Sequence, residues 1–207
     1  MKEIDIESWN RKEHYNFFKQ FTDPYFSVVV DLDVTKAYYY AKKQRISFFV
    51  FYLHACMKAL NSVENLRYRI RDKKVIVHDV IHASATILRK DNTFGFSFIN
   101  YSDDFIVFNQ NFKKEKKRIE NSSNLFPKED TDDCIFCSTL PWFNFTSHKE
   151  PLFGMVKESV PKLAFGKYIS KDDKLMMPVA IAVNHALVDG YHVGLFVEEY
   201  QNILNEF

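Results

Sequence analysis

Segments whose apolar residues repeat with the period of a strand alternate along the chain with segments that have the period of a helix. Residues 25–33 (YFSVVVDLD) are rich in β-branched side chains and predict a strand. Residues 48–61 are apolar almost all round, so they predict an enclosed helix, with Ser47 as its N-cap. Near the C-terminal end, an apolar stripe predicts an amphipathic helix over residues 191–205. The stripe comprises Val193, Phe196, Val197, Tyr200, Ile203 and Leu204.

The remaining pattern adds helices and strands in mixed order. Helices are expected over residues 9–21 with Ser8 as N-cap, over residues 34–43, and in a lysine-rich segment that Ser102 opens. The segment RYRIRDKKVIVHD predicts a hairpin that turns at Asp72 and Lys73. Further strands are expected in IHASATILR and TFGFSFINY and near residues 134–138, 142–147, 163–169 and 175–183, with a surface loop at 120–130. This order predicts one α/β domain over residues 1–207, a mixed β-sheet flanked by helices.

Composition and charge narrow the classes of protein. The chain has 207 residues, with 28 basic and 27 acidic side chains and a net charge of +1. This balance gives no long-range attraction for nucleic acid or for an anionic membrane. The first residues lack the apolar core of a signal peptide, and no run of about 18 apolar residues is present. We therefore expect a soluble, cytoplasmic protein without nucleic-acid or membrane partners.

The three cysteines do not predict a disulfide framework or a metal site. Cys134 and Cys137 form a single C-x-x-C motif without two further ligands at matching spacing. Their segment, DDCIFCSTL, has the pattern of a strand, whereas a redox motif lies at the start of a helix. We expect two buried, inert thiols and no metal.

The stretch AVNHALVDGYHVGLF holds the residues most suited to chemistry. His185 follows an apolar strand and is either a packed histidine or a general base, since imidazole accepts protons near neutral pH. Asp189 can cap the following helix, pair with a cation, or do both. Gly190 is expected to provide a positive φ or a close backbone approach at the corner. His192 is expected to be a structural residue in the first helical turn.

Several motifs together resemble one known family. H-A-L-V-D-G followed by Y-H-V resembles the H-x-x-x-D-G signature of the chloramphenicol acetyltransferase family, which also occurs in dihydrolipoyl acyltransferase cores and peptide-synthetase condensation domains. The segments WNRKEHYNFF, LRYRIRDKKVIVHD and STLPWFNFTS resemble further motifs of that family, and so does the stretch from FGKYIS to YHVGLF. These matches span nearly the whole chain in the family's order.

The resemblance implies a fold, a reaction and an assembly. The fold is that of chloramphenicol acetyltransferase and other CoA-dependent acyltransferases, and the reaction moves acetyl from acetyl-CoA to a hydroxyl within a ternary complex. His185 matches the general base and Ser138 matches the serine that stabilises the oxyanion. Asp189 matches an aspartate that pairs with an arginine, here Arg11, and so orients the base. The family forms homotrimers with active sites between subunits.

The resemblance also implies binding residues. Trp142, Lys167 and Tyr168 match positions associated with coenzyme A, although a surface lysine and core aromatics remain the alternative. The acceptor pocket is expected to include Phe17, Phe18, Pro24, Phe94, Phe96 and His148.

The chain departs from the family around the two substrates. Ser47 and Phe49 replace a lysine and a tyrosine near the pantetheine, and Ala164 replaces a threonine. His148 and Glu150 replace apolar pocket residues with groups that can carry charge. Three hypotheses follow: a chloramphenicol O-acetyltransferase, which leads; an acetyltransferase for a different, more polar hydroxyl; and a non-catalytic binding protein that has kept the fold.

Overall fold

A mixed β-sheet forms the centre of the molecule. The computed structural model describes residues 1–127, 131–151 and 159–207, and within them the main sheet has seven strands. Its order is β2-β10-β8-β7-β5-β6, and the short β9 also pairs with β10. The strands are β2 (Tyr25–Asp33), β5 (His82–Leu88), β6 (Phe94–Phe96), β7 (Cys134–Leu140), β8 (Lys162–Gly166), β9 (Ile169–Lys171) and β10 (Lys174–Asn184). β7 runs parallel to β5 and β8, while the other pairs are antiparallel, so the predicted mixed sheet is confirmed.

A second, three-stranded sheet contains the predicted hairpin. β3 (Tyr68–Arg71) pairs with β4 (Lys74–Val77), which pairs with β1 (Lys2–Glu3). Asp72 and Lys73 form the turn with φ of 50° and 65°, both in the left-handed region. This backbone fits a tight two-residue turn between antiparallel strands.

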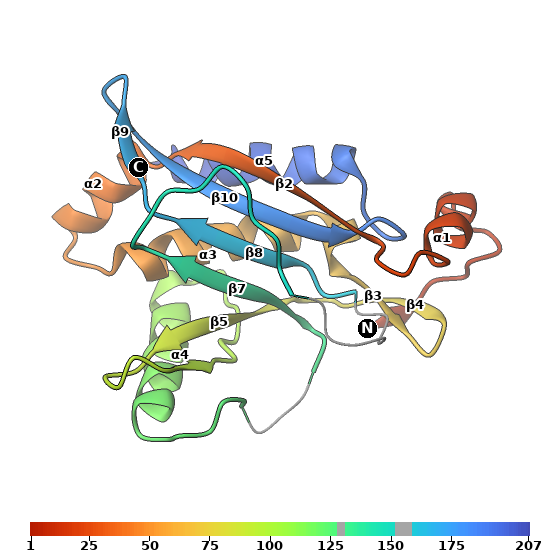
Figure 1. Cartoon of the computed structure of the whole chain (residues 1–207), viewed down its shortest axis with the longest axis horizontal. Helices are drawn as coiled ribbons and strands as arrows, with labels where there is room; N and C mark the ends of the chain where they lie inside the picture. The colour runs from red at the N-terminus through yellow and green to blue at the C-terminus, as the bar shows by residue number, and fades with distance from the viewer. Residues whose placement is uncertain (128–130, 152–158) are drawn as a thin grey trace.

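Helices cover one face of the main sheet. α3 (Phe48–Ser62) and α5 (Gly190–Leu204) lie together behind it in Figure 1. The Oγ of Ser47 accepts a hydrogen bond from the Val50 amide, so the predicted N-cap is confirmed. The other helices are α1 (Lys12–Phe18), α2 (Thr35–Lys43), the 3₁₀ turn η1 (Glu64–Arg67) and α4 (Phe105–Glu120).

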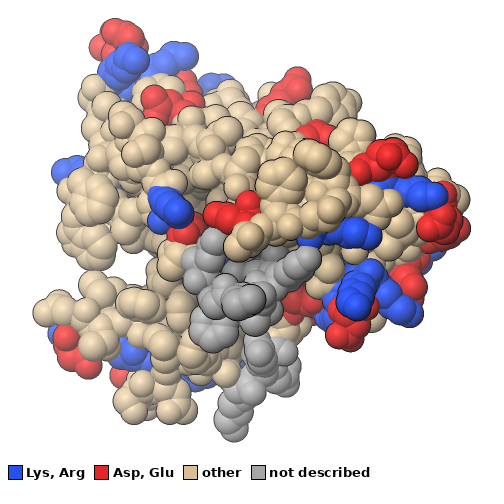
Figure 2. Space-filling model, turned by 45° about the vertical axis from the view of Figure 1, so that its right-hand side comes forward, with Lys and Arg blue, Asp and Glu red and all other residues tan. Residues whose placement is uncertain are grey.

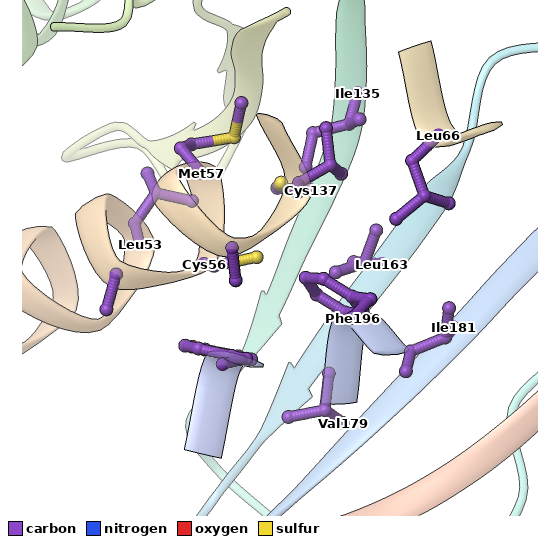
Figure 3. Packing of buried hydrophobic residues seen from close by; sticks show 14 of the residues in the cluster. Leu53, Cys56, Met57, Leu66, Ile135, Cys137, Leu163, Val179, Ile181 and Phe196 are labelled. Atoms are coloured by element: carbon purple, nitrogen blue, oxygen red, sulfur yellow. The ribbon is translucent and has the colours of Figure 1, made fainter. Parts of the chain in front are cut away.

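The hydrophobic core fills the space between these two helices and the sheet. Figure 3 shows side chains of α3 and α5 meeting strand residues from β7, β8 and β10. The labelled residues are Leu53, Cys56, Met57, Leu66, Ile135, Cys137, Leu163, Val179, Ile181 and Phe196. Phe196 is 1 % exposed, as the predicted apolar stripe of α5 requires.

Small residues line the opposite face of the sheet. Alternation places Ala164, Ala180 and Ala182 away from the helix-covered core, whereas their strand neighbours belong to it. The segment after β7 crosses this face, in front of the sheet in Figure 1. A Cβ added to Gly166 would lie 2.8 Å from the ring of Phe145, so this glycine permits the close packing.

Two predicted helices begin later than expected. α1 spans only residues 12–18, with Arg11 at the N-cap position, because the preceding residues form turns and Ser8 hydrogen-bonds Asp5 instead. α4 begins at Phe105 because the carboxylate of Asp104 caps it by accepting from the Ile106 amide.

Three strand predictions were wrong in extent or in kind. Residues 142–147 leave the sheet after β7, where Pro141 lacks the amide that would continue the ladder. The strand expected over 163–169 is divided into β8 and β9, and the strand expected in TFGFSFINY ends at Phe96. Of the predicted loop 120–130, residues 128–130 lie outside the described part.

Charged side chains of both signs are interspersed over the surface. Figure 2 shows basic and acidic groups side by side on the face in view, without separation by sign. Within the described ranges, no helix is long and apolar enough to cross a membrane.

Candidate active site

His185 follows directly on the last residue of β10. Its backbone amide donates to the carbonyl of Pro24 at 2.8 Å, which continues the pairing of β10 with β2. The ring of Phe18 stacks on the imidazole with centroids 3.9 Å apart and planes inclined by 10°. Phe26 contacts the imidazole at 4.7 Å, and Phe17 packs edge-on against Phe18. The expected acceptor residues Phe17, Phe18 and Pro24 thus lie around His185.

The imidazole of His185 is packed by its neighbours, and one of its nitrogens has no partner within the described part of the chain. Its Nδ1 is buried, and no hydrogen-bond partner reaches it from the described residues. The stacked aromatic rings restrict rotation of the imidazole.

An ion pair between Arg11 and Asp189 holds the loop that carries His185. Nη1 of Arg11 donates to Oδ2 of Asp189 at 2.5 Å, and Nη2 donates to the backbone carbonyl of His185 at 3.4 Å. The side chain of Arg11 is only 8 % exposed. Burial alone would raise the pKa of Asp189, but the bond from Arg11 and the charges of His192 and Arg11 hold it below its ordinary value. One guanidinium thus contacts both ends of the His185–Asp189 segment.

Asp189 also occupies the N-cap position of α5. The helix begins at Gly190, so the capping interpretation and the cation-pairing interpretation both hold. The expectation for Gly190 was wrong. Its φ lies outside the left-handed region, and an added Cβ would meet nothing within 4 Å, because Gly190 is already the first helical residue.

Ser138 lies far from His185 within one chain. Ser138 pairs with Ala164, and Ala164 pairs with Ala180, which precedes His185 by five residues on β10. Five residues at about 3.3 Å each and two strand spacings of about 4.8 Å place the two positions on the order of 19 Å apart. The structure therefore does not join the expected base and oxyanion donor within a single copy.

Phe96 lies level with Ser138 on the other side of β5. Thr86 pairs with Phe96, and the neighbouring Ala85 pairs with Cys137, one residue before Ser138. Phe94 is two residues along on β6, and its ring contacts Phe96 edge-on at 5.4 Å. These two expected acceptor residues thus group with Ser138 and not with His185.

The three residues expected to bind coenzyme A gather at the carboxyl ends of β7 and β8. The Lys167 amide donates to the carbonyl of Phe143 at 2.9 Å, which joins the segment of Trp142 to that of Lys167 and Tyr168. Trp142 is 62 % exposed, so it is not a core aromatic. A hydrogen bond with Tyr38, followed by burial, raises the pKa of Tyr168 to about 12. In Figure 1 this end of the sheet lies opposite the end of β10 that leads to His185.

A cavity of about 280 Å³ lies beside the start of β2 and the last residues of β10. Its lining includes Tyr25, Phe26, His148, Glu150 and Lys162. Nδ1 of His148 lies 3.6 Å from Oε1 of Glu150, and both side chains are less than 20 % exposed. Lys162 is 5 % exposed and donates to the carbonyl of Pro151 at 2.9 Å. The expected pocket residue His148 is thus part of a polar wall.

Three contributors to these groups were not predicted from the sequence. Phe26 contacts His185, Tyr38 bonds Tyr168, and Lys162 lines the cavity. The lysine at the start of the apolar strand KLAFG was a usable signal, because buried lysines need a specific partner. Phe26 and Tyr38 lie among other aromatics and carry no distinguishing pattern.

The cysteines are buried thiols. Burial raises the pKa of Cys137 well above its ordinary value, which makes the thiolate scarce. Within residues 1–127, 131–151 and 159–207, no three metal-ligating side chains form a group that could hold a metal ion.

The chain matches one family of known proteins over almost its full length. The family model described as "Chloramphenicol acetyltransferase" matches residues 1–201. A protein of that name from Klebsiella sp is 30 % identical over 205 residues, which cover 99 % of this chain and 94 % of the relative. A chloramphenicol acetyltransferase from Staphylococcus aureus is 29 % identical, with 97 % of each chain covered.

Solved structures give the same assignment. A structure named chloramphenicol acetyltransferase superposes with a TM-score of 0.87 at 29 % identity, covering 99 % of this chain and 100 % of the other. A probable dihydrolipoamide acetyltransferase from Listeria monocytogenes 4b F2365 shares the fold, with a TM-score of 0.67 at 18 % identity and coverage of 100 % and 95 %. The chain therefore belongs to the chloramphenicol acetyltransferase family, which is a family of acyltransferases.

Proposed function

We propose that this protein transfers acetyl from acetyl-CoA to a hydroxyl group of a small molecule, with chloramphenicol as the leading acceptor. The observation that carries the proposal is the His185 site. A histidine beside an aromatic wall is held through its own backbone by Arg11 and Asp189. This arrangement, in a chain of this family, suits proton transfer from a bound alcohol.

His185 acts as the general base. Its Nε2 takes the proton of the acceptor hydroxyl as the oxygen attacks, and later gives that proton to the departing thiolate. A positioned base commonly contributes about 10²–10⁴ in rate. Asp189 and Arg11 hold the imidazole in place and do not take part in proton transfer.

Ser138 is the proposed oxyanion donor. Attack on a thioester develops negative charge on the carbonyl oxygen, and a fixed hydroxyl can donate a hydrogen bond to it. Acetyl-CoA would supply the acetyl thioester. Trp142, Lys167 and Tyr168 offer it a ring for the adenine and a cation for the phosphates, three to four residues beyond the row of Ser138 and Ala164.

A complete site then requires two copies of the chain. Ser138 and His185 of one copy are too far apart to act on one substrate. The order of the main sheet leaves β2 at an edge, with the side away from β10 unpaired among the described strands. We propose a homotrimer in which His185 of one copy faces Ser138 of the next across this region.

The cavity beside β2 favours a second candidate, an acetyltransferase for a more polar hydroxyl compound. His148 and Glu150 lie against each other in its wall, with the ammonium-bearing Lys162. Buried polar groups discriminate strongly against ligands that leave them unpaired. An acceptor with its own charged or hydrogen-bonding groups can bond to this wall, whereas an apolar one would desolvate it without compensation.

Steady-state acetylation by the purified protein tests the proposal. We expect chloramphenicol-dependent release of CoA thiol, a loss of about 10²–10⁴ for His185→Ala, and a loss of about 10²–10³ for Ser138→Ala. Ser170→Ala on β9 is the matched control, because Ser170 is an exposed strand serine.

A chloramphenicol rate no higher than that of His185→Ala would overturn the antibiotic assignment. A panel of other hydroxyl compounds then separates the remaining candidates. Thiol release with a polar acceptor that requires His185 supports the second function. Thiol release with none of the compounds supports a binding protein without turnover.

A further inference from the structure

His192 makes a contact with Asp189 that the proposed chemistry does not use. It lies in the first turn of α5, with 14 % of its side chain exposed. Together with Arg11 and Asp189, whose side chains form the ion pair, it lines a cavity of about 520 Å³. His14 and Glu64 line the same cavity.

A single nitrogen of His192 faces two groups of Asp189. The backbone amide of Asp189 donates to Nδ1 at 3.2 Å, and Oδ1 of the same aspartate lies 2.8 Å from Nδ1. Nδ1 carries either a lone pair or a proton in the plane of the ring. With the lone pair it accepts from the amide; with the proton it can only donate, and the carboxylate is then its partner.

We propose that His192 is a positioning residue for the His185 loop. The unprotonated Nδ1 of its neutral ring anchors the backbone amide of Asp189 and leaves the Asp189 carboxylate to Arg11. This proposal rests on the proposed function, because the segment that it positions ends at the general base. The anchored amide lies between His185 and α5, so its loss frees the loop at one end. The ring acts through Asp189 and does not contact the reacting atoms.

The surroundings of His192 favour the neutral ring. Burial lowers its pKa below the ordinary value of 6.5, Arg11 lowers it further, and Asp189 opposes both. His14, Glu64 and Tyr68 are the other titratable groups that line the same cavity. A neutral ring carries a single N–H, and with that proton on Nε2 the lone pair of Nδ1 is available to the amide at neutral pH. At acid pH the protonated ring turns its Nδ1–H toward Oδ1, the amide loses its acceptor, and the carboxylate is drawn away from Arg11.

Two substitutions separate this role from simple packing. His192→Asn keeps an acceptor near the position of Nδ1 but loses the ring, whereas His192→Phe keeps the ring but has no acceptor. We expect His192→Asn to retain at least about half of kcat and His192→Phe to lose about tenfold, because one fixed hydrogen bond is worth roughly this much. The KM values for both substrates should change less than twofold.

The pH profile provides a second readout. In the wild type, protonation of His192 should add to the fall of kcat/KM toward acid pH. In His192→Asn this contribution is absent, so kcat/KM should fall less steeply than in the wild type. Equal activities of the two variants, or equal slopes in the wild type and His192→Asn, would overturn the proposal.

Nitrogen NMR of His192 in the wild-type protein tests the contact without turnover. We expect the proton on Nε2 and an unprotonated Nδ1 at neutral pH. A proton on Nδ1 would overturn the proposal even if His192→Phe failed to fold. Absence of acetyl transfer by the wild type would overturn the proposed function instead, so the two failures are distinguishable.

Discussion

At the scale of single residues, Arg11 joins parts of the chain that are distant in sequence. It precedes its partner Asp189 by 178 positions and comes from the start of α1. Its guanidinium contacts a carboxylate and the backbone carbonyl of His185, which a lysine could not do with one planar group. Removal of this side chain would leave Asp189 charged and partly buried.

We predict that Arg11→Ala lowers the free energy of unfolding by about 1.5–3 kcal/mol, the usual range for a hydrogen bond to a charged group. Lys12→Ala is the control, because Lys12 pairs with the exposed Glu7 and should change stability little. Urea denaturation of both variants measures the difference. Equal effects of the two substitutions would contradict the structural role of Arg11.

The pH dependence of this difference has a definite sign. The folded pKa of Asp189 is held below its ordinary value of 3.8, so the ion pair stabilises the folded state above about pH 4. The contribution is lost as the pH falls through the folded pKa. The stabilities of the wild type and Arg11→Ala should therefore converge in acid.

Sequence reasoning reached residues of this kind only through the family resemblance. Arg11 alone has the pattern of a solvated helix charge, and Ser138 is an unmarked strand residue. The contact of His192 with the backbone of Asp189 was not predicted, because spacing along a chain does not show which way a ring nitrogen points. The expectation for Gly190 failed because the helix begins one residue earlier than predicted.

At the scale of elements, α5 follows the candidate base and packs its apolar stripe into the core. The stripe residue Phe196 is 1 % exposed and meets side chains of the sheet and of α3 (Figure 3). Tyr191 on the same helix is 72 % exposed. The helix thus anchors one end of the His185 loop by burial.

We expect Phe196→Ala to destabilise the protein by about 3–5 kcal/mol through lost burial and the cavity left behind. Tyr191→Ala, the control on the same helix, should change stability by less than about 0.5 kcal/mol. Thermal and urea denaturation of the two variants provide the measurement. Similar losses in both would show that the apolar stripe is not the main anchor of α5.

Predictions of helices and strands succeeded where an apolar period continued over many residues. They failed where contacts of a few local side chains determined the boundary or the conformation. The buried α3 and the amphipathic α5 were predicted to within a few residues. Residues 142–147 have a strand-like pattern, but Pro141 and the packing of Phe145 against Gly166 take them out of the sheet. α4 starts later than predicted because Asp104, and not Ser102, caps its first amides.

At the scale of the whole molecule, the expected site residues form two groups at different places on one sheet. His185 lies beyond the end of β10 with Arg11, Phe18 and Asp189, while Ser138 lies in the middle strand β7. The family resemblance implied a site between subunits, but the distance within one chain depends on strand order and register, which the sequence alone does not show. This separation is the structural basis for proposing a site shared between copies.

Mixing two inactive variants tests the shared site. We predict that chains carrying His185→Ala and chains carrying Ser138→Ala, co-expressed and purified as mixed assemblies, regain about a quarter of wild-type activity, because random association leaves that share of interfaces with both groups intact. Assemblies of either variant with the double variant His185→Ala, Ser138→Ala are the control and should stay inactive. Mixed assemblies no more active than the separate variants would contradict the shared site.

The distance between Ser138 and His185 on the sheet also has a genetic consequence. In a cell that expresses an intact copy and a copy damaged at His185, each damaged chain would disable the site of a neighbour whose own sequence is intact. The damaged chain still lends its Ser138 to an intact His185, so only one site is lost per damaged chain and the loss of activity matches the share of damaged chains. Two gene copies that are each inactive alone, one damaged at His185 and the other at Ser138, could therefore complement each other, because each supplies the group that the other lacks.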